Sequence, residues 1–152
     1  MDCDECCCDE EEISEESSEI VRRKIQVCHN NEQYILTFYE EKLAKENDHL
    51  LLTYIIKTSK KEDEVKEKKE KIMTSVGPFV KDCSTRGIQC EFVFHQAKAG
   101  EGICEMVKEN KPHLVVMGSR GLSKLQRTIQ TSVSEYVMLN STAPVLIIPV
   151  RK

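Results

Sequence analysis

Short apolar segments alternate with longer amphipathic segments along most of this chain. The apolar segments predict five β-strands, at residues 24–29, 49–57, 88–96, 113–118 and 143–150. The segments between them have helical spacing or helix-ending signals, which predict helices at 31–47, 60–87, 100–110 and 132–140. Strands that alternate with helices over short connections favour an α/β fold, with a parallel sheet, right-handed crossovers and helices on both faces.

The strands differ in how their polar residues are distributed. Residues 49–57 are apolar on both faces, as expected of a strand buried within a parallel sheet. In 88–96, Phe92 and Phe94 point one way, whereas Glu91 and His95 point the other, which is typical of an edge strand. The helix at 60–87 is rich in charges of both signs, which indicates a solvated face rather than a nucleic-acid surface. We expect Gly77-Pro78 to kink or split this helix.

Charge separates the first twenty residues from the rest. Residues 1–20 hold ten acidic and no basic residues, which leaves sixteen acidic and twenty-two basic residues, a net charge of +6, beyond them. We therefore expect 1–20 to be a disordered acidic tail and 21–152 to be a single domain. The longest apolar run is too short to span a membrane, and the acidic start does not resemble a secretion signal. A cytoplasmic location follows as an expectation.

Eight cysteines occur in the chain, four in the tail and four in the domain. In a reducing compartment they are expected to be free thiols rather than disulfides. The tail cysteines allow a soft metal site, an acylation site or no special role, and their spacing does not match a zinc ribbon. No metal site is therefore predicted.

A glycine-containing loop follows the strand at 113–118 and carries the most specific motif. Gly118 and Gly121 are followed, after nine intervening residues, by Thr131-Ser132, then by a helix and an apolar "APVLIIPV" strand. With these motifs, residues 21–152 resemble the universal stress protein family, as a divergent member of eukaryotic type. Nucleotide-binding members have Gly-x2-Gly-x9-Gly-Ser/Thr here, so Thr131 stands where the third glycine belongs.

The resemblance implies the UspA-like fold, related to the adenine-nucleotide α-hydrolases, with a five-stranded parallel sheet in the order 3-2-1-4-5. This order agrees with the edge-like pattern of 88–96. The last strand would form the other edge, and in many family members it pairs across a two-fold axis. We expect a homodimer through Val145, Leu146, Ile147, Ile148 and Val150, with Pro149 limiting the length of the pairing.

In this strand order, a ligand crevice lies outside the carboxyl ends of the first and fourth strands. Glycines there let backbone N–H groups approach phosphate oxygens, and a helix N-terminus favours anions. The candidate nucleotide-binding residues are Val27, His29, Asn31, Gly118, Ser119, Arg120, Gly121, Arg127, Thr131 and Ser132. The alternatives are a simple glycine turn, solvated basic side chains, and a capping box in which Ser132 is committed to Glu135 of its own helix.

Two departures from the family motif count against nucleotide binding. Thr131 places a β-branched side chain beside the expected phosphate. The first strand ends in Val27-Cys28-His29, where ATP-binding members resemble Val-Asp-x-Ser, so a carboxylate is missing near the adenine and ribose. Two functional hypotheses stay open: a module whose nucleotide site has degenerated, and a binder of ATP or AMP. No other cofactor is implied.

Cys28-His29 also raises the hypothesis of a thiol nucleophile. Adjacent strand residues point to opposite faces, so the two side chains diverge, and a core position for Cys28 is favoured. No catalytic residue is predicted, with slow ATP hydrolysis as the weaker alternative. The leading hypothesis is a non-enzymatic, homodimeric stress-response module that binds unknown protein partners and neither nucleic acid nor membrane.

Overall fold

The computed structural model describes residues 22–28, 33–58, 60–119 and 132–149 of the chain. These residues form one five-stranded sheet, and the four strand pairings are all parallel. The strand order is β3-β2-β1-β4-β5, which confirms the predicted fold class. The strands are β1 (Lys24–Cys28), β2 (His49–Ile56), β3 (Gln89–Gln96), β4 (Leu114–Ser119) and β5 (Val145–Pro149).

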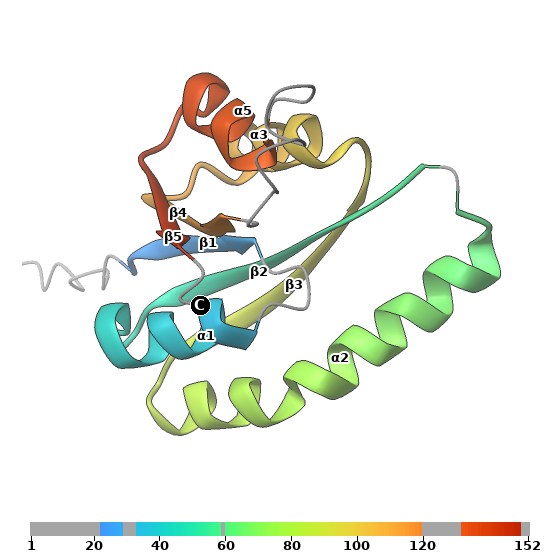
Figure 1. Ribbon diagram of the computed structural model, residues 1–152. Helices are drawn as coiled ribbons and strands as arrows, with labels where there is room; N and C mark the ends of the chain where they lie inside the picture. The colour runs from blue at the N-terminus through green and yellow to red at the C-terminus, as the bar shows by residue number, and fades with distance from the viewer. Residues whose placement is uncertain (1–21, 29–32, 59, 120–131, 150–152) are drawn as a thin grey trace, which may run out of the picture.

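Helices cover both faces of the sheet (Figure 1). One face carries α1 (Gln33–Phe38), which continues into a π-helical turn, η1 (Tyr39–Leu43), and α2 (Glu62–Thr85). The other face carries α3 (Ala99–Asn110) and α5 (Val133–Asn140). Figure 1 also shows that β2 and β3 run past the end of β1, since Cys28 pairs with Thr53 and β2 continues to Ile56.

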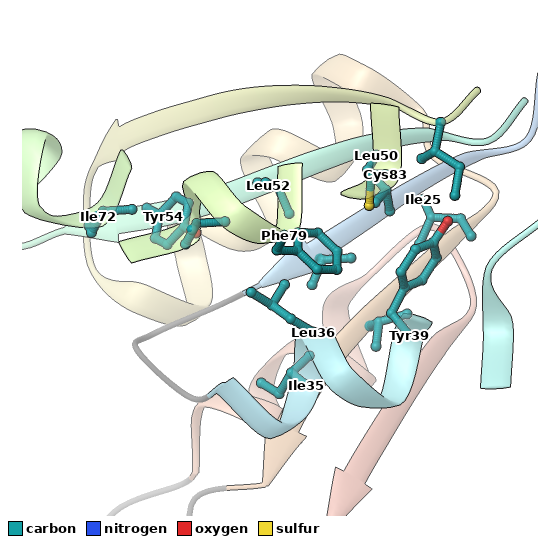
Figure 2. Packing of buried hydrophobic residues seen from close by; sticks show 14 of the residues in the cluster. Ile25, Ile35, Leu36, Tyr39, Leu50, Leu52, Tyr54, Ile72, Phe79 and Cys83 are labelled. Carbon is teal, nitrogen blue, oxygen red and sulfur yellow. The ribbon is translucent and has the colours of Figure 1, made fainter. Parts of the chain in front are cut away.

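The larger hydrophobic core lies between the sheet and the α1–α2 layer. Figure 2 shows Phe79 of α2 lying between Leu36 and Tyr39 of the first helix and the strand residues above them. The rings of Tyr39 and Phe79 meet edge to face, with centroids 6.4 Å apart. Aliphatic residues of β1 and β2 complete this core, as the low aromatic content of the sequence requires. Figure 2 labels Ile25, Leu50 and Leu52 among them, and it also labels Tyr54 of β2 and Ile72 and Cys83 of α2, which belong to the same core.

A smaller core lies on the other face, where α3 and α5 pack together over β1 and β4. Gly100 permits this helix contact, because a Cβ atom there would lie 2.7 Å from Cδ1 of Tyr136 on α5. Gly102 is similarly close to the end of β3, with a virtual Cβ 3.2 Å from Cδ2 of His95. The glycines of the "KAGEG" segment therefore serve helix packing.

A buried carboxylate ends the first helical segment earlier than the sequence pattern predicted. Asp48 is 1% exposed and accepts hydrogen bonds from Arg23 Nε (2.9 Å), Tyr39 Oη (2.6 Å) and the Lys45 backbone N–H (3.0 Å). Arg23 Nη2 also donates to the Leu43 carbonyl oxygen (2.6 Å). These bonds redirect backbone groups that a longer helix would use, so the helical segment ends at Leu43 rather than near residue 47.

Pro78 does not split α2, which is one helix from Glu62 to Thr85, so that part of the prediction was wrong. The apolar side chains on both sides of the proline explain this continuity. Ile72 and Val76 precede Pro78, Phe79 and Cys83 follow it, and these four are buried against the same core. Burial on both sides outweighs the single backbone hydrogen bond that proline removes.

Candidate functional site

The ligand crevice expected from the strand order would lie at the carboxyl ends of β1 and β4. Val27 pairs with Val116 and Cys28 pairs with Met117, after which β4 continues through Gly118 and Ser119. Val27 is completely buried and Gly118 is buried, whereas Ser119 is half-buried. The structure therefore brings these candidates to the same end of the sheet.

Ser132 begins the helix that follows the loop. It is the N-cap of α5, and its hydroxyl oxygen accepts a hydrogen bond from the Glu135 backbone N–H (3.1 Å). The Ser132 hydroxyl also lies 3.2 Å from that of Ser134. The acceptor function of Ser132 is thus used by its own helix, as one of the sequence alternatives proposed, while a hydroxyl can still donate one hydrogen bond.

Six of the ten candidate residues lie outside the described part of the chain. They are His29, Asn31, Arg120, Gly121, Arg127 and Thr131. Their roles stay predictions from the sequence. The last dimer candidate, Val150, also lies outside it, whereas Val145, Leu146, Ile147 and Ile148 lie on β5 at the edge of the sheet.

Cys28 is a core residue with an unreactive thiol. Its exposed fraction is 9%, and burial raises the pKa of this thiol to about 12, although a contact with Gln26 partly opposes the shift. A thiol with this pKa is almost entirely protonated at neutral pH, and the thiolate is the nucleophilic form. This environment disfavours the thiol-nucleophile hypothesis at Cys28.

The other domain cysteines also contribute to packing. Cys104 is buried in the smaller core, and Cys83 is buried in the larger one. A hydrogen bond between the Cys83 and Cys90 thiols raises the pKa of Cys83, and burial raises it further. The same hydrogen bond lowers the pKa of the half-buried Cys90.

Gln26 is a buried polar residue of β1 that no motif of the sequence marks as part of a site. It is completely buried in the middle of the sheet, and its Nε2 lies 3.5 Å from the Ile103 carbonyl oxygen of α3. Its Oε1 has no hydrogen-bond partner among the described residues. No pattern could have revealed it, because a single polar residue between apolar neighbours also occurs on exposed strands.

Two histidines near the β3 edge pair with carboxylates. His49 Nε2 lies 3.2 Å from Glu91 Oε2, and His95 Nε2 lies 2.7 Å from Glu105 Oε2. Within the described ranges, no group of three or more potential metal ligands occurs. None of the helices in those ranges is both long enough and apolar enough to cross a membrane.

Comparison with known proteins agrees with this architecture. Residues 14–149 match the model of the universal stress protein family. The chain belongs to the universal stress protein family. Over 70 residues it is 33% identical to the universal stress protein A-like protein of Arabidopsis thaliana, a match that covers 46% of this chain and 40% of the relative.

A second relative is the universal stress protein YxiE of Bacillus subtilis, with 34% identity over 86 residues, which covers 57% of this chain and 56% of YxiE. The chain thus spans about half the length of these curated relatives or less. Among solved structures, an Arabidopsis thaliana universal stress protein family protein with AMP bound aligns with a TM-score of 0.61 at 19% identity. That alignment covers 85% of this chain and 92% of the other chain, and it supports the shared fold.

Proposed function

We propose that this universal stress protein is a cytoplasmic, homodimeric stress-response module that acts by binding protein partners rather than by catalysis, and that its nucleotide site has degenerated. The observation that carries the proposal is the end of β1. There, Val27 and Cys28 are core residues with an aliphatic side chain and a protonated thiol, at the positions where nucleotide-binding members of the family resemble Val-Asp. Neither supplies the charge or the hydrogen bonds that the ribose and adenine of a nucleotide require.

The state of Ser132 supports the same proposal. Its hydroxyl oxygen accepts the Glu135 N–H (3.1 Å), so Ser132 has a structural role in α5 that does not depend on a ligand. Thr131 also stands at the third glycine position of the motif. The motif residues Thr131 and Ser132 therefore fit the fold without any contact to a phosphate.

The β5 edge supports the homodimer. The Val115 N–H donates to the Pro144 carbonyl oxygen (2.9 Å), so backbone groups alternate along β5 and those of Val145, Ile147 and Pro149 face away from β4. The missing N–H of Pro149 is therefore one that would face the free edge. Met138 and Leu139, exposed to 54% and 72%, add apolar surface on α5, which packs on β5.

A second candidate function is the binding of AMP or ATP in the crevice. It is favoured by the small, buried Gly118 at the end of β4 and by the AMP bound to the Arabidopsis relative of the same fold. Here Ser132 would donate its remaining hydroxyl proton to a phosphate oxygen while its oxygen continues to cap α5.

Calorimetric titration with AMP separates the two candidates, with Thr131→Gly as the informative variant. A degenerate site predicts no saturable heat for the wild-type protein up to about 1 mM AMP. Restoring the third glycine removes the β-branched side chain and is expected to strengthen binding by about tenfold or more. Thr142→Gly, a change in the connection before β5, is the matched control and should bind as the wild type does. Micromolar binding by the wild type would refute degeneration and establish the second candidate.

A further inference from the structure

β3 forms one outer edge of the sheet and lacks the features that usually protect an edge. It is eight residues long, contains no proline, glycine or lysine, and has Glu91 as its only acidic residue. Edge strands in soluble proteins are generally short, or carry lysine, proline or a bulge, because a long free edge pairs with other chains. The opposite edge, β5, has five residues and ends at a proline.

Every second residue of β3 directs its backbone groups away from the sheet. The Gln89 N–H donates to the Asp48 carbonyl oxygen (3.0 Å), and the Ala97 N–H donates to that of Ile56 (3.1 Å). Backbone direction alternates along a strand, so the odd-numbered residues bond to β2, whereas the N–H and C=O groups of Cys90, Phe92 and Phe94 point outward. Among the described residues, no strand lies beyond β3 to accept these bonds.

The side chains on the α3 side of this edge form an ordered row of Glu91, Val93 and His95. Val93 is half-buried but belongs to neither of the hydrophobic core clusters found in the described residues. The Glu91 side chain is 56% exposed and that of His95 is 30% exposed. An apolar centre is therefore flanked by an acid on one side and an imidazole on the other.

We propose that this edge binds a second copy of the chain, by antiparallel pairing of β3 with β3 about a two-fold axis at Val93. In this register, Val93 lies opposite Val93 of the second copy, and Glu91 lies opposite His95 of the second copy. The acid–imidazole contact occurs twice because of the symmetry. Phe92 lies opposite Phe94 of the second copy, with their outward backbone groups joined in a hydrogen-bonded pair.

The neighbouring registers are less favourable. A shift that centres the axis on Phe92 places Glu91 opposite Val93, and one centred on Phe94 places Glu91 opposite Ala97. Both shifts lose the two acid–imidazole contacts and oppose a carboxylate to an apolar residue. Acid–imidazole contacts also continue within each chain, because Glu91 contacts His49 (3.2 Å) and His95 contacts Glu105 (2.7 Å). Pairing of a carboxylate with an imidazole therefore favours the Val93-centred register.

This contact is distinct from the proposed β5 dimer, because β3 and β5 are opposite edges of the sheet. The axis at Val93 is perpendicular to the sheet, so pairing continues the sheet into the second copy and keeps equivalent helices on the same face. Pairing at both edges would join β5 dimers end to end. Loss of the β3 contact alone would leave two-chain assemblies.

Cysteine cross-linking tests the register directly. Val93→Cys places two thiols at a non-hydrogen-bonded pair, where Cα atoms are about 4.5 Å apart, within disulfide range. Glu91→Cys is the matched control, because its two copies would lie about 13 Å apart.

Both variants are exposed to mild copper-catalysed air oxidation, and the disulfide-linked peptides are identified by mass spectrometry. We expect the peptide that carries the Val93→Cys change to link to its own copy about tenfold or more faster than the peptide that carries Glu91→Cys. Equal rates for the two variants, or no linkage through position 93, would overturn the proposal.

Sedimentation equilibrium provides the second measurement. Val93→Lys places like charges directly opposite each other at the axis and is expected to lower the average mass of the assembly, whereas the neutral, β-branched Val93→Thr should leave it unchanged. Wild-type mass in the lysine variant would count against β3 pairing. Thermal melts of both variants check that the half-buried site tolerates the change.

Discussion

At the scale of single residues, Asp48 is the clearest structural determinant. Three donors from separate parts of the chain converge on its buried carboxylate, namely Arg23, Tyr39 and the Lys45 N–H. Burial acts to raise the pKa of Asp48, but hydrogen bonds from Arg23, Tyr39 and Lys45 outweigh it, so the pKa is lowered overall. The charged form is therefore the one that the fold stabilises.

Asp48→Asn is expected to lower the free energy of unfolding by about 3 kcal/mol at pH 7, because an amide places a donor among donors and removes the carboxylate that balances the Arg23 charge. Urea denaturation measures the change. Tyr39→Phe removes one of the donors and should lose about 1 kcal/mol. If Asp48→Asn were as stable as the wild type, the carboxylate would have no structural role.

The same carboxylate gives a pH dependence with a defined sign. Because the native pKa is lowered, the contribution of Asp48 is fully present above its unfolded pKa of about 4 and is lost as the pH falls through the native value. The stability difference between the wild type and Asp48→Asn should therefore shrink on going from about pH 6 to about pH 2. A difference that stays constant over this range would contradict the assignment.

Two glycines in helices are expected to respond differently to alanine. A Cβ at Gly100 would lie 2.7 Å from the Tyr136 ring, whereas a Cβ at Gly77 of α2 would meet nothing within 4 Å apart from its neighbours in the chain. Gly100→Ala should destabilise the protein by about 1–3 kcal/mol through overpacking. Gly77→Ala should change the stability by less than about 1 kcal/mol, because the helix propensity that alanine adds is opposed by contact of its Cβ with the Pro78 ring.

Thermal and urea unfolding of both glycine variants provide the comparison. In the double variant Gly100→Ala/Tyr136→Ala, the missing ring relieves the clash. The loss of unfolding free energy in the double variant should therefore be smaller than the sum of the losses in the two single variants. Strict additivity would show that the Gly100–Tyr136 contact does not limit how closely α3 and α5 pack.

At the scale of elements, substitutions at Ser132 distinguish its structural role in α5 from a role in ligand binding. Ser132→Ala removes the N-cap of α5 and should cost about 1 kcal/mol, whereas Ser132→Asp supplies another good cap and should keep the wild-type stability. A carboxylate at this position repels phosphate, so Ser132→Asp would abolish any AMP binding without unfolding the helix. Equal unfolding midpoints for the alanine variant and the wild type would exclude the capping role.

The strands were the elements most accessible from the sequence. Their apolar residues follow one another directly or alternate with polar residues. The alternation of Phe92 and Phe94 with Glu91 and His95 indicates the edge position of β3. Helix ends and breaks were less accessible, because tertiary contacts decide them. Asp48 ends the first helical segment through bonds to distant residues, and burial on both sides of Pro78 keeps α2 whole.

At the scale of the whole molecule, the fold positions the candidate site but does not determine its chemistry. The order β3-β2-β1-β4-β5 places Val27 and Gly118 at the same end of the sheet, as the resemblance implied. The sequence allowed two roles for Ser132, contact with a phosphate or capping of its own helix. The hydrogen bond that its hydroxyl oxygen accepts from the Glu135 N–H favours the capping role. Gln26 could not be identified from the sequence, because its burial depends on the packing of α3 over the sheet.

The proposed β5 dimer gives a prediction at the same scale. The backbone of Ile147, the middle residue of β5, faces the free edge, and a two-fold pairing centred on this residue would bring its two copies together. Ile147→Lys should shift sedimentation from two chains towards one, and Ile147→Thr should not, because only the lysine introduces like charges across the axis. Unchanged assembly in Ile147→Lys would argue against pairing through β5.

The central claim, that the nucleotide site has degenerated, is tested most directly by the nucleotide content of the purified protein. The protein is prepared without added ligand and denatured, and the released adenine nucleotides are quantified by chromatography against the protein concentration. A degenerate site predicts much less than one nucleotide per chain. Stoichiometric AMP or ATP would contradict it and would show that the crevice at Val27 and Gly118 is a working binding site despite Thr131 and the missing carboxylate.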